Sequence, residues 1–98
     1  MKNSFNDPMD NKLQERLLIL MEEAAEVQQA ISKIFRFGLS ARYPNDTSPD
    51  NHLVLHNEIA DFFAVVSVLK EMDFIDDNLI REGIEKKLDK MQTWTTYK

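Results

Sequence analysis

The sequence predicts an all-α protein whose three main helices form an antiparallel bundle. Apolar residues recur at alternating spacings of four and three along three separate segments, which is the period of one helix face. Capping signals precede these segments. With 2 glycines and 3 prolines, the chain has few residues for the tight turns of a β-sandwich. Because 98 residues is the size of one ordinary domain, we treat residues 1–98 as a single domain.

The first helix is expected to start at Asp7 and Pro8, an N-cap residue followed by proline at the first helical position. Its apolar stripe consists of Leu13, Leu17, Leu20, Ala24, Val27, Ile31 and Ile34. Gly38 follows the stripe and is the expected C-cap, because glycine readily adopts the backbone conformation that ends helices. Residues 39–47 are predicted to form a loop.

The second and third helices carry similar signals. Ser48 and Pro49 repeat the start signal, and the second helix should end near Met72. Its apolar stripe is Leu55, Ile59, Phe62, Val66 and Leu69. Asp76 is the expected N-cap of the third helix, which should end near Trp94. The stripe of the third helix is Ile80, Ile84, Leu88 and Met91.

The second helix is apolar on more than one side. A further apolar stripe consists of Val54, Val65, Val68 and Met72. A third face carries the small residues Asn57, Ala60, Ala64 and Ser67. Three short helices cannot cover all of these surfaces, so we expect homo-oligomerisation to complete the bundle, as a homodimer or a dimer of dimers.

Composition excludes several classes of function. The chain has no cysteine, which rules out disulfides and zinc sites built on thiolates. Its net charge of −5 disfavours a nucleic acid polymer as partner, because the phosphate backbone is itself negative. The N-terminus lacks a signal-peptide pattern, and the uninterrupted apolar runs are short for a membrane span. We therefore expect a cytoplasmic protein with no membrane partner.

Four acidic residues fall at positions where apolar residues are expected. Glu23 and Glu26 on the first helix, and Glu58 and Asp61 on the second, each form an i, i+3 pair on one helix face. Their neighbours on those faces are isoleucine, alanine and valine. An ionised carboxylate in such surroundings loses hydration worth several kcal/mol unless a partner replaces the water. The alternative is that both pairs lie on solvated faces.

The two acidic pairs are predicted to converge. Each acidic stripe is displaced by one residue, about 100°, in the same sense from the apolar stripe of its helix. In an antiparallel pair these equal offsets turn both stripes to the same side. Two like charges about 4 Å apart repel by about 4 kcal/mol at an effective dielectric constant of 20, so the cluster should attract cations. Oxygen ligands favour Mg²⁺, with Mn²⁺ as a second candidate.

Residues 22–26 read EEAAE and residues 58–61 read EIAD. This pair of motifs resembles the EExxE…ExxD signature of the MazG-like all-α nucleoside triphosphate pyrophosphohydrolases, and the resemblance extends over residues 13–94. It implies an Mg²⁺-dependent enzyme in which water attacks the α-phosphate of a nucleotide substrate, such as a deoxynucleotide or a non-standard nucleotide, and releases a monophosphate and pyrophosphate. The metal ligands that it implies are Glu23, Glu26, Glu58 and Asp61. It also implies that Glu22 positions or deprotonates the water.

Five further residues are candidates for substrate binding. Lys33 continues the acidic stripe of the first helix, and Arg36 lies one turn away. On the third helix Lys87, Lys90 and Trp94 recur at i, i+3 and i+7. The cations would bind phosphate groups, and Trp94 would stack on the base. Alternatively, Lys33 and Arg36 interact with the helix dipole, the lysines of the third helix belong to a solvated face, and Trp94 is a packing residue.

Three other functions are weighed against this one. Phosphoribosyl-ATP pyrophosphohydrolase shares the chemistry, but nothing in the sequence identifies its substrate. A carboxylate-bridged di-iron bundle requires Glu-x-x-His on two helices, whereas Glu26 and Asp61 occupy the fourth positions here. A non-catalytic helical dimer, acting as an adaptor or regulator, accounts for the apolar surface of the second helix. It leaves the four acids without a role.

Overall fold

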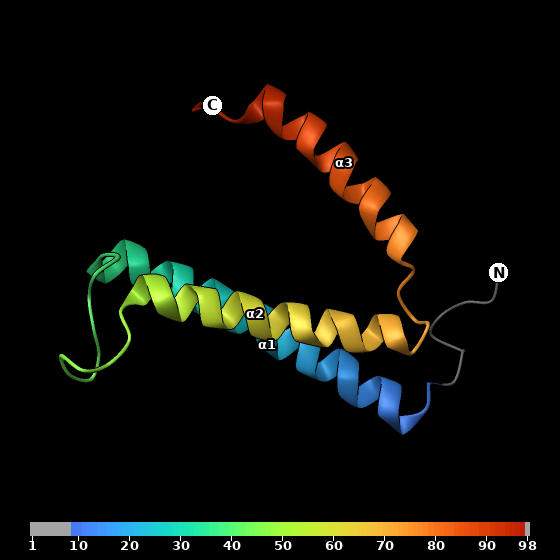
Figure 1. Ribbon diagram of the computed structural model, residues 1–98, viewed down its shortest axis with the longest axis horizontal. Coiled ribbons are helices and arrows are strands. Elements are labelled where there is room, and N and C mark those ends of the chain that lie inside the picture. Colours follow the sequence, from blue (N-terminus) through green and yellow to red (C-terminus); the bar gives the residue numbers. More distant parts are fainter. Residues whose placement is uncertain (1–8, 98) are drawn as a thin grey trace. The chain divides into compact units, whose positions relative to one another are not determined.

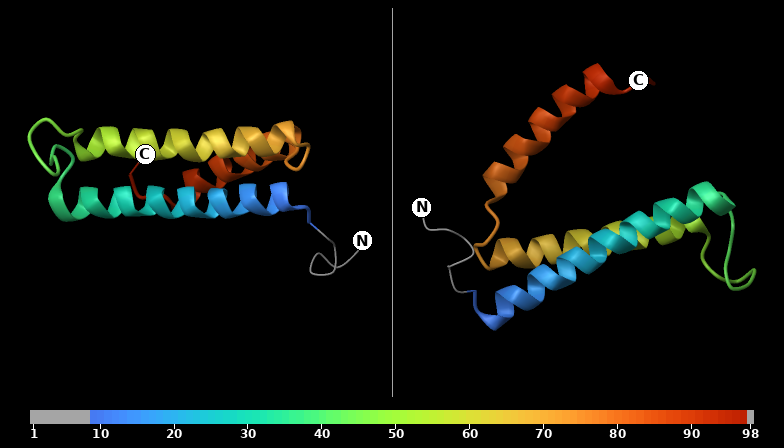
Figure 2. Two further views of the ribbon diagram at one scale, coloured as in Figure 1. Left: turned by 90° about the horizontal axis from the view of Figure 1, so that it is seen from below. Right: turned by 180° about the vertical axis from the view of Figure 1, so that it is seen from behind.

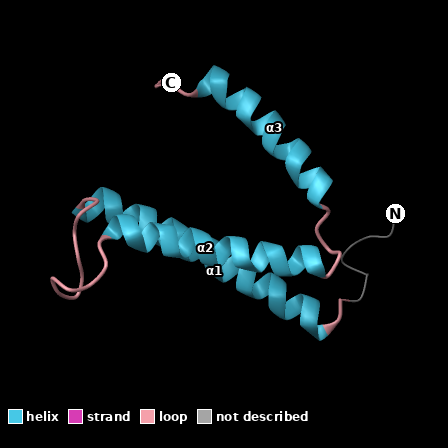
Figure 3. Cartoon of the chain, in the orientation of Figure 1, coloured by secondary structure: helices cyan, strands magenta, loops and turns pink. Residues whose placement is uncertain are grey.

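The computed structural model describes residues 9–97, which form three helices and no strand. The helices are α1 (Asn11–Phe37), α2 (Asn51–Glu71) and α3 (Asp77–Trp94), and Figure 3 shows them joined by loops. The predicted all-α class is therefore confirmed. The chain divides after Val68 into two compact units, and the second contains the last turn of α2 together with α3. That residues 1–98 act as a single domain stays a prediction.

The N-terminal signal at Asp7 and Pro8 lies outside the described residues. The structure places the start of α1 at Asn11, and the Asp10 side chain caps it by accepting a hydrogen bond of 2.7 Å from the backbone N–H of Leu13. Asp10 satisfies an N–H group that lacks a partner within the helix. At the other end Gly38 has φ 98° and donates its N–H to Ile34 O, which confirms the predicted C-cap.

The predicted start of α2 is wrong by two residues. Asp50, and not Ser48, caps the helix, because its side chain accepts a hydrogen bond of 2.8 Å from Leu53 N–H. Ser48 instead belongs to the preceding turn, where its N–H donates to Asn45 O. Asn51 links this loop to the end of α1, since its Nδ2 donates to Gly38 O at 3.0 Å.

In the second unit the predicted boundaries are confirmed. α2 ends at Glu71, close to Met72, and α3 starts after Asp76, whose side chain accepts from Leu79 N–H at 3.1 Å. Lys70 and Asp77 form an ion pair of 2.9 Å across the short connection. α3 ends at Trp94, as the sequence predicts.

α1 and α2 pack side by side and run antiparallel, which Figures 1 and 2 show from three directions. The least exposed residues of the first unit mark the contact between the helices. On α1 these are Leu13, Arg16, Leu17, Ile19, Leu20, Glu23, Val27, Ala30 and Ile34. On α2 they are Asn51, Val54, Leu55, Glu58, Phe62, Val65, Val66 and Val68. Ala30, at 4% exposure, is the one side chain of α1 that is fully buried.

This contact is rotated from the predicted apolar stripes toward the acidic ones. Ile31 and Ile59 belong to the predicted stripes but are exposed, at 42% and 36%, whereas Glu23 and Glu58 are half-buried. The physical reason is that the acidic stripes also contain apolar residues. Ala30 and Val65 extend the contact surface to that side, and the small Ala30 side chain allows close approach of the helices.

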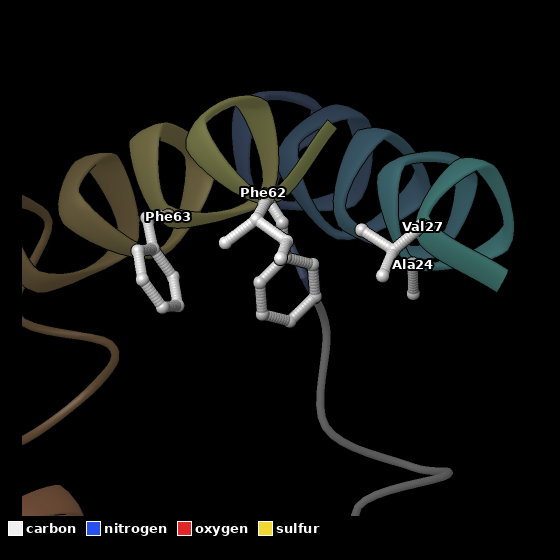
Figure 4. A pocket seen from close by; sticks show the side chains of 5 residues that line it. Ala24, Val27, Phe62 and Phe63 are labelled. Carbon is white, nitrogen blue, oxygen red and sulfur yellow. The ribbon is translucent and has the colours of Figure 1, made fainter. Parts of the chain in front are cut away.

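The opposite edge of the α1–α2 contact is an open apolar groove of about 410 Å³. Its lining residues are Ala24, Val27, Ile59, Phe62 and Phe63. Figure 4 shows the labelled side chains from both helices projecting to the same side. The acidic residues and this apolar groove therefore lie at the two edges of the α1–α2 contact, and around α1 the pair Ala24 and Val27 is displaced by about 100° from the pair Glu23 and Glu26.

Among the described residues, α2 is the one helix that is long and apolar enough, by length and composition, to cross a membrane. The expectation that the protein has no membrane partner stays a prediction. A core helix of a soluble assembly has the same composition, and an acid such as Asp61 costs about 2.5–3.5 kcal/mol at the bilayer centre.

Candidate metal centre

Four carboxylates from two helices meet at one edge of the α1–α2 contact. We call Glu23, Glu26, Glu58 and Asp61 the acid cluster. One oxygen of each residue lies within 4.8 Å of the corresponding oxygens of the other three. The i, i+3 spacing places each pair on one face, and the antiparallel packing brings the two faces together. The predicted convergence of these side chains is therefore confirmed, while their role as metal ligands stays a prediction.

The cluster has an inner and an outer part. Glu23 and Glu58 are half-buried, and Glu26 and Asp61 are exposed. Glu23 Oε2 and Glu58 Oε2 are buried and have no hydrogen-bond partner among the described residues. A buried acceptor without a partner costs free energy, and a charged one costs more than a neutral one. A cation between the carboxylates would remove this cost, so the residues present fit a hard divalent ion.

The acids raise one another's pKa values. Burial first, and then the negative charges of Glu26 and Asp61, raise the pKa of the Glu23 carboxyl. The pKa of Glu58 is raised mainly by its hydrogen bond with the Glu26 carboxyl, followed by burial and the nearby negative charges. In both cases the surroundings favour the protonated carboxyl more than water does. A divalent ion would reverse this preference, because it stabilises the ionised carboxylates.

Glu22 lies outside the acid cluster. It is exposed, and its charge makes the smallest of the contributions that raise the pKa of Glu23. The structure therefore does not bring Glu22 to the point where the four carboxylates meet. Its predicted role in positioning or deprotonating a water molecule stays a prediction.

A polar pocket of about 220 Å³ adjoins the acid cluster. Its lining residues are Glu26, Gln29, Ala30, Lys33, Val54 and Glu58. The structure thus brings Lys33 to the site, as the acidic stripe of α1 predicts. Gln29 was not identified from the sequence. Its position three residues after Glu26 and four before Lys33 was the available signal, since such neighbours share a helix face.

The remaining predicted substrate contacts are Arg36 on α1 and Lys87, Lys90 and Trp94 on α3. The Arg36 guanidinium lies 4.9 Å from the centre of the Phe37 ring and does not line the polar pocket. Within α3, Lys87 Nζ lies 4.7 Å from the centre of the Trp94 ring, so the predicted i, i+7 relation is a real contact. Contact of a substrate with Arg36, Lys87, Lys90 or Trp94 stays a prediction.

Comparisons of the chain with known protein families, with curated proteins and with solved structures find no match. The chain is therefore classified by its fold and its site alone. The chain is a small all-α protein with three helices in its described part and an acid cluster that could hold a metal ion. The donor set contains only carboxylate oxygens, which are typical ligands of Mg²⁺ and Mn²⁺.

Proposed function

We propose that the protein is an Mg²⁺-dependent nucleoside triphosphate pyrophosphohydrolase, as its resemblance to the MazG-like family implies. The observation that carries the proposal is the acid cluster, whose oxygens lie within 4.8 Å of one another and include two buried oxygens without a partner. In the proposed reaction a water oxygen bonds to the α-phosphorus of a deoxynucleoside or non-standard nucleoside triphosphate. The bond between the α-phosphorus and the bridging oxygen breaks, and pyrophosphate leaves.

The acid cluster would hold Mg²⁺ or Mn²⁺. When bound, such an ion polarises phosphoryl oxygens and makes a coordinated water a stronger nucleophile near neutral pH. The chain's own residues would do the rest. Glu22, one residue from the ligand Glu23, would accept a proton from the attacking water, and Lys33 would bind negative phosphate oxygens.

The donor set supports this proposal over the alternatives. A di-iron carboxylate bundle uses histidine at the fourth position of each Glu-x-x-His motif, and the acid cluster has Glu26 and Asp61 at those positions. A non-catalytic adaptor would need no cation. An ion that binds only the folded protein, at about 100 times its dissociation constant, adds about 2.7 kcal/mol of stability. Melting curves with and without Mg²⁺ or Mn²⁺ therefore separate the enzyme from the adaptor.

We also propose that the protein is a homodimer, or a dimer of dimers, in the cytoplasm. The apolar groove supports this assembly, since Phe63 within it is 63% exposed and Ile59 is 36% exposed. An exposed contiguous apolar patch is uncommon on a soluble monomer. A second copy would cover the groove on the edge of the helix pair away from the acid cluster, so the site would stay open to substrate.

The proposal is tested by incubating the purified protein with a panel of ribo- and deoxynucleoside triphosphates and Mg²⁺. We expect a nucleoside monophosphate and pyrophosphate as products. Glu58→Gln should reduce turnover at least about a hundredfold, because it removes one metal ligand from a step to which the ion contributes several kcal/mol. The control Glu71→Gln makes the same change on the same helix at an exposed position outside the acid cluster. Diphosphate and orthophosphate as products, or full activity of Glu58→Gln, would contradict the proposal.

A further inference from the structure

The two ends of the acid cluster differ in chemistry. Toward the C-terminal end of α1 lies the polar pocket with Gln29 and Lys33. In the opposite direction the same helix faces carry Ile19, four residues before Glu23, and Val65, four residues after Asp61. One end of the site therefore offers an amide and a cation, and the other end offers aliphatic side chains.

Lys33 is available to an anionic ligand. Among the described residues it forms no ion pair, although Glu26 and Glu58 line the same pocket. Its backbone oxygen accepts a hydrogen bond from Asn51 Nδ2 at 3.4 Å, which ties this turn of α1 to the start of α2. The backbone is thus held in place, while the ammonium group at the end of its flexible side chain remains free to bind a phosphate group.

The spacing of these groups suits an extended polyanion. From Glu26 the helix rises about 4.5 Å to Gln29 and about 10.5 Å to Lys33, at about 1.5 Å per residue. The lysine side chain can reach back over part of this distance. A phosphate chain that starts at the acid cluster would thus meet first the Gln29 amide, which donates hydrogen bonds, and then the Lys33 ammonium.

We propose that Gln29 and Lys33 hold the pyrophosphate portion of the nucleoside triphosphate. This inference rests on the proposed function and adds to it the direction of the substrate and a role for Gln29. The triphosphate runs from the acid cluster toward the C-terminal end of α1, and the nucleoside lies on the side of Ile19 and Val65. Lys33 then neutralises the negative charge that the leaving pyrophosphate gains when its bond to the α-phosphorus breaks.

The direction is tested by measuring the binding of each product separately. Inorganic pyrophosphate and a nucleoside monophosphate are titrated into the protein by calorimetry in the presence of Mg²⁺. Lys33→Met should weaken pyrophosphate binding about tenfold or more, since it removes a charge-assisted hydrogen bond, and should leave monophosphate binding within about twofold. Gln29→Ala should have a smaller effect of the same kind. The control Lys12→Met removes an exposed cation from the same helix outside the pocket, at a residue with no proposed role in the site, and should change neither affinity.

Each outcome decides one of the two proposals. Loss of monophosphate binding instead of pyrophosphate binding in Lys33→Met would reverse the direction and overturn the inference. Equal pyrophosphate affinity of Lys33→Met and the unchanged protein, or no Mg²⁺-dependent pyrophosphate binding by the unchanged protein, would also overturn it. Pyrophosphate binding that depends on Lys33, in a protein that hydrolyses no nucleoside triphosphate, would contradict the proposed function and leave the pyrophosphate site in place.

Discussion

Glu23 and Glu58 make the site suitable for a metal ion, and the same two residues lower the stability of the folded protein. Each has a buried oxygen without a partner, and burial and neighbouring acids raise the pKa of each carboxyl. Groups arranged in this way destabilise the folded protein when they are ionised and no cation is bound. Such clusters of perturbed carboxyls are typical of functional sites, where the preference for a ligand outweighs the cost to the fold.

This cost predicts how stability depends on pH in the protein without metal. Because the folded pKa of Glu58 lies above its ordinary value of 4.5, the folded state binds the proton more tightly than the unfolded state. The stability that this proton contributes is therefore fully present below pH 4.5 and is lost as the pH rises through the folded pKa. Glu58→Gln should flatten this decline and raise Tm at pH 7. Thermal unfolding in a chelator, between pH 4.5 and 8, measures both effects.

The control Glu71→Gln should retain the slope of the unchanged protein. Asp77 does not contribute to the slope of stability between pH 4.5 and 8, because its ion pairs with Lys70 and Arg81 lower its pKa below 3.8. The stability that Asp77 contributes is present above pH 3.8 and is lost as the pH falls through its folded pKa, outside the measured range. A stability profile of Glu58→Gln identical to that of Glu71→Gln would contradict the interpretation of Glu58.

At the scale of the helices, local signals differ in how well they predict boundaries. Gly38 and Asp76 cap α1 and α3 as expected. Ser48 followed by Pro49 looks equally suitable for α2, yet Asp50 supplies the cap. The sequence does not distinguish them, since the turn that engages Ser48 depends on its hydrogen bond to Asn45.

The position of this cap can be tested by stability measurements. Asp50→Ala should destabilise the protein by about 1 kcal/mol, within the range of 0.5–2 kcal/mol found for the loss of N-caps. Ser48→Ala should cost less, because the hydrogen bond of its hydroxyl to Asn45 lies in an exposed loop. Urea unfolding at pH 7 measures both values. A larger loss for Ser48→Ala than for Asp50→Ala would show that the sequence-based start was right.

The acid cluster was predictable because it depends on two local periodicities and one antiparallel pairing. The rotation of the α1–α2 contact was not predictable, since it depends on how closely the helices approach at Ala30. This rotation leaves Ile59 and Phe63 exposed in the apolar groove. Gln29 was missed for a related reason: a polar residue on a helix surface is ordinary until a neighbouring helix encloses it in a pocket.

At the scale of the whole molecule, the apolar groove and the composition of α2 lead to the same experiment. If a second copy covers the groove, light scattering coupled to size-exclusion chromatography should give a multiple of 11.5 kDa. Phe63→Glu should shift the protein toward the monomer, because it places a charge in an apolar interface. The control Ser40→Glu adds the same charge in the loop after α1. A monomer at micromolar concentration would contradict the homodimer, and flotation of the protein with lipid vesicles would indicate instead that the apolar surface of α2 contacts a membrane.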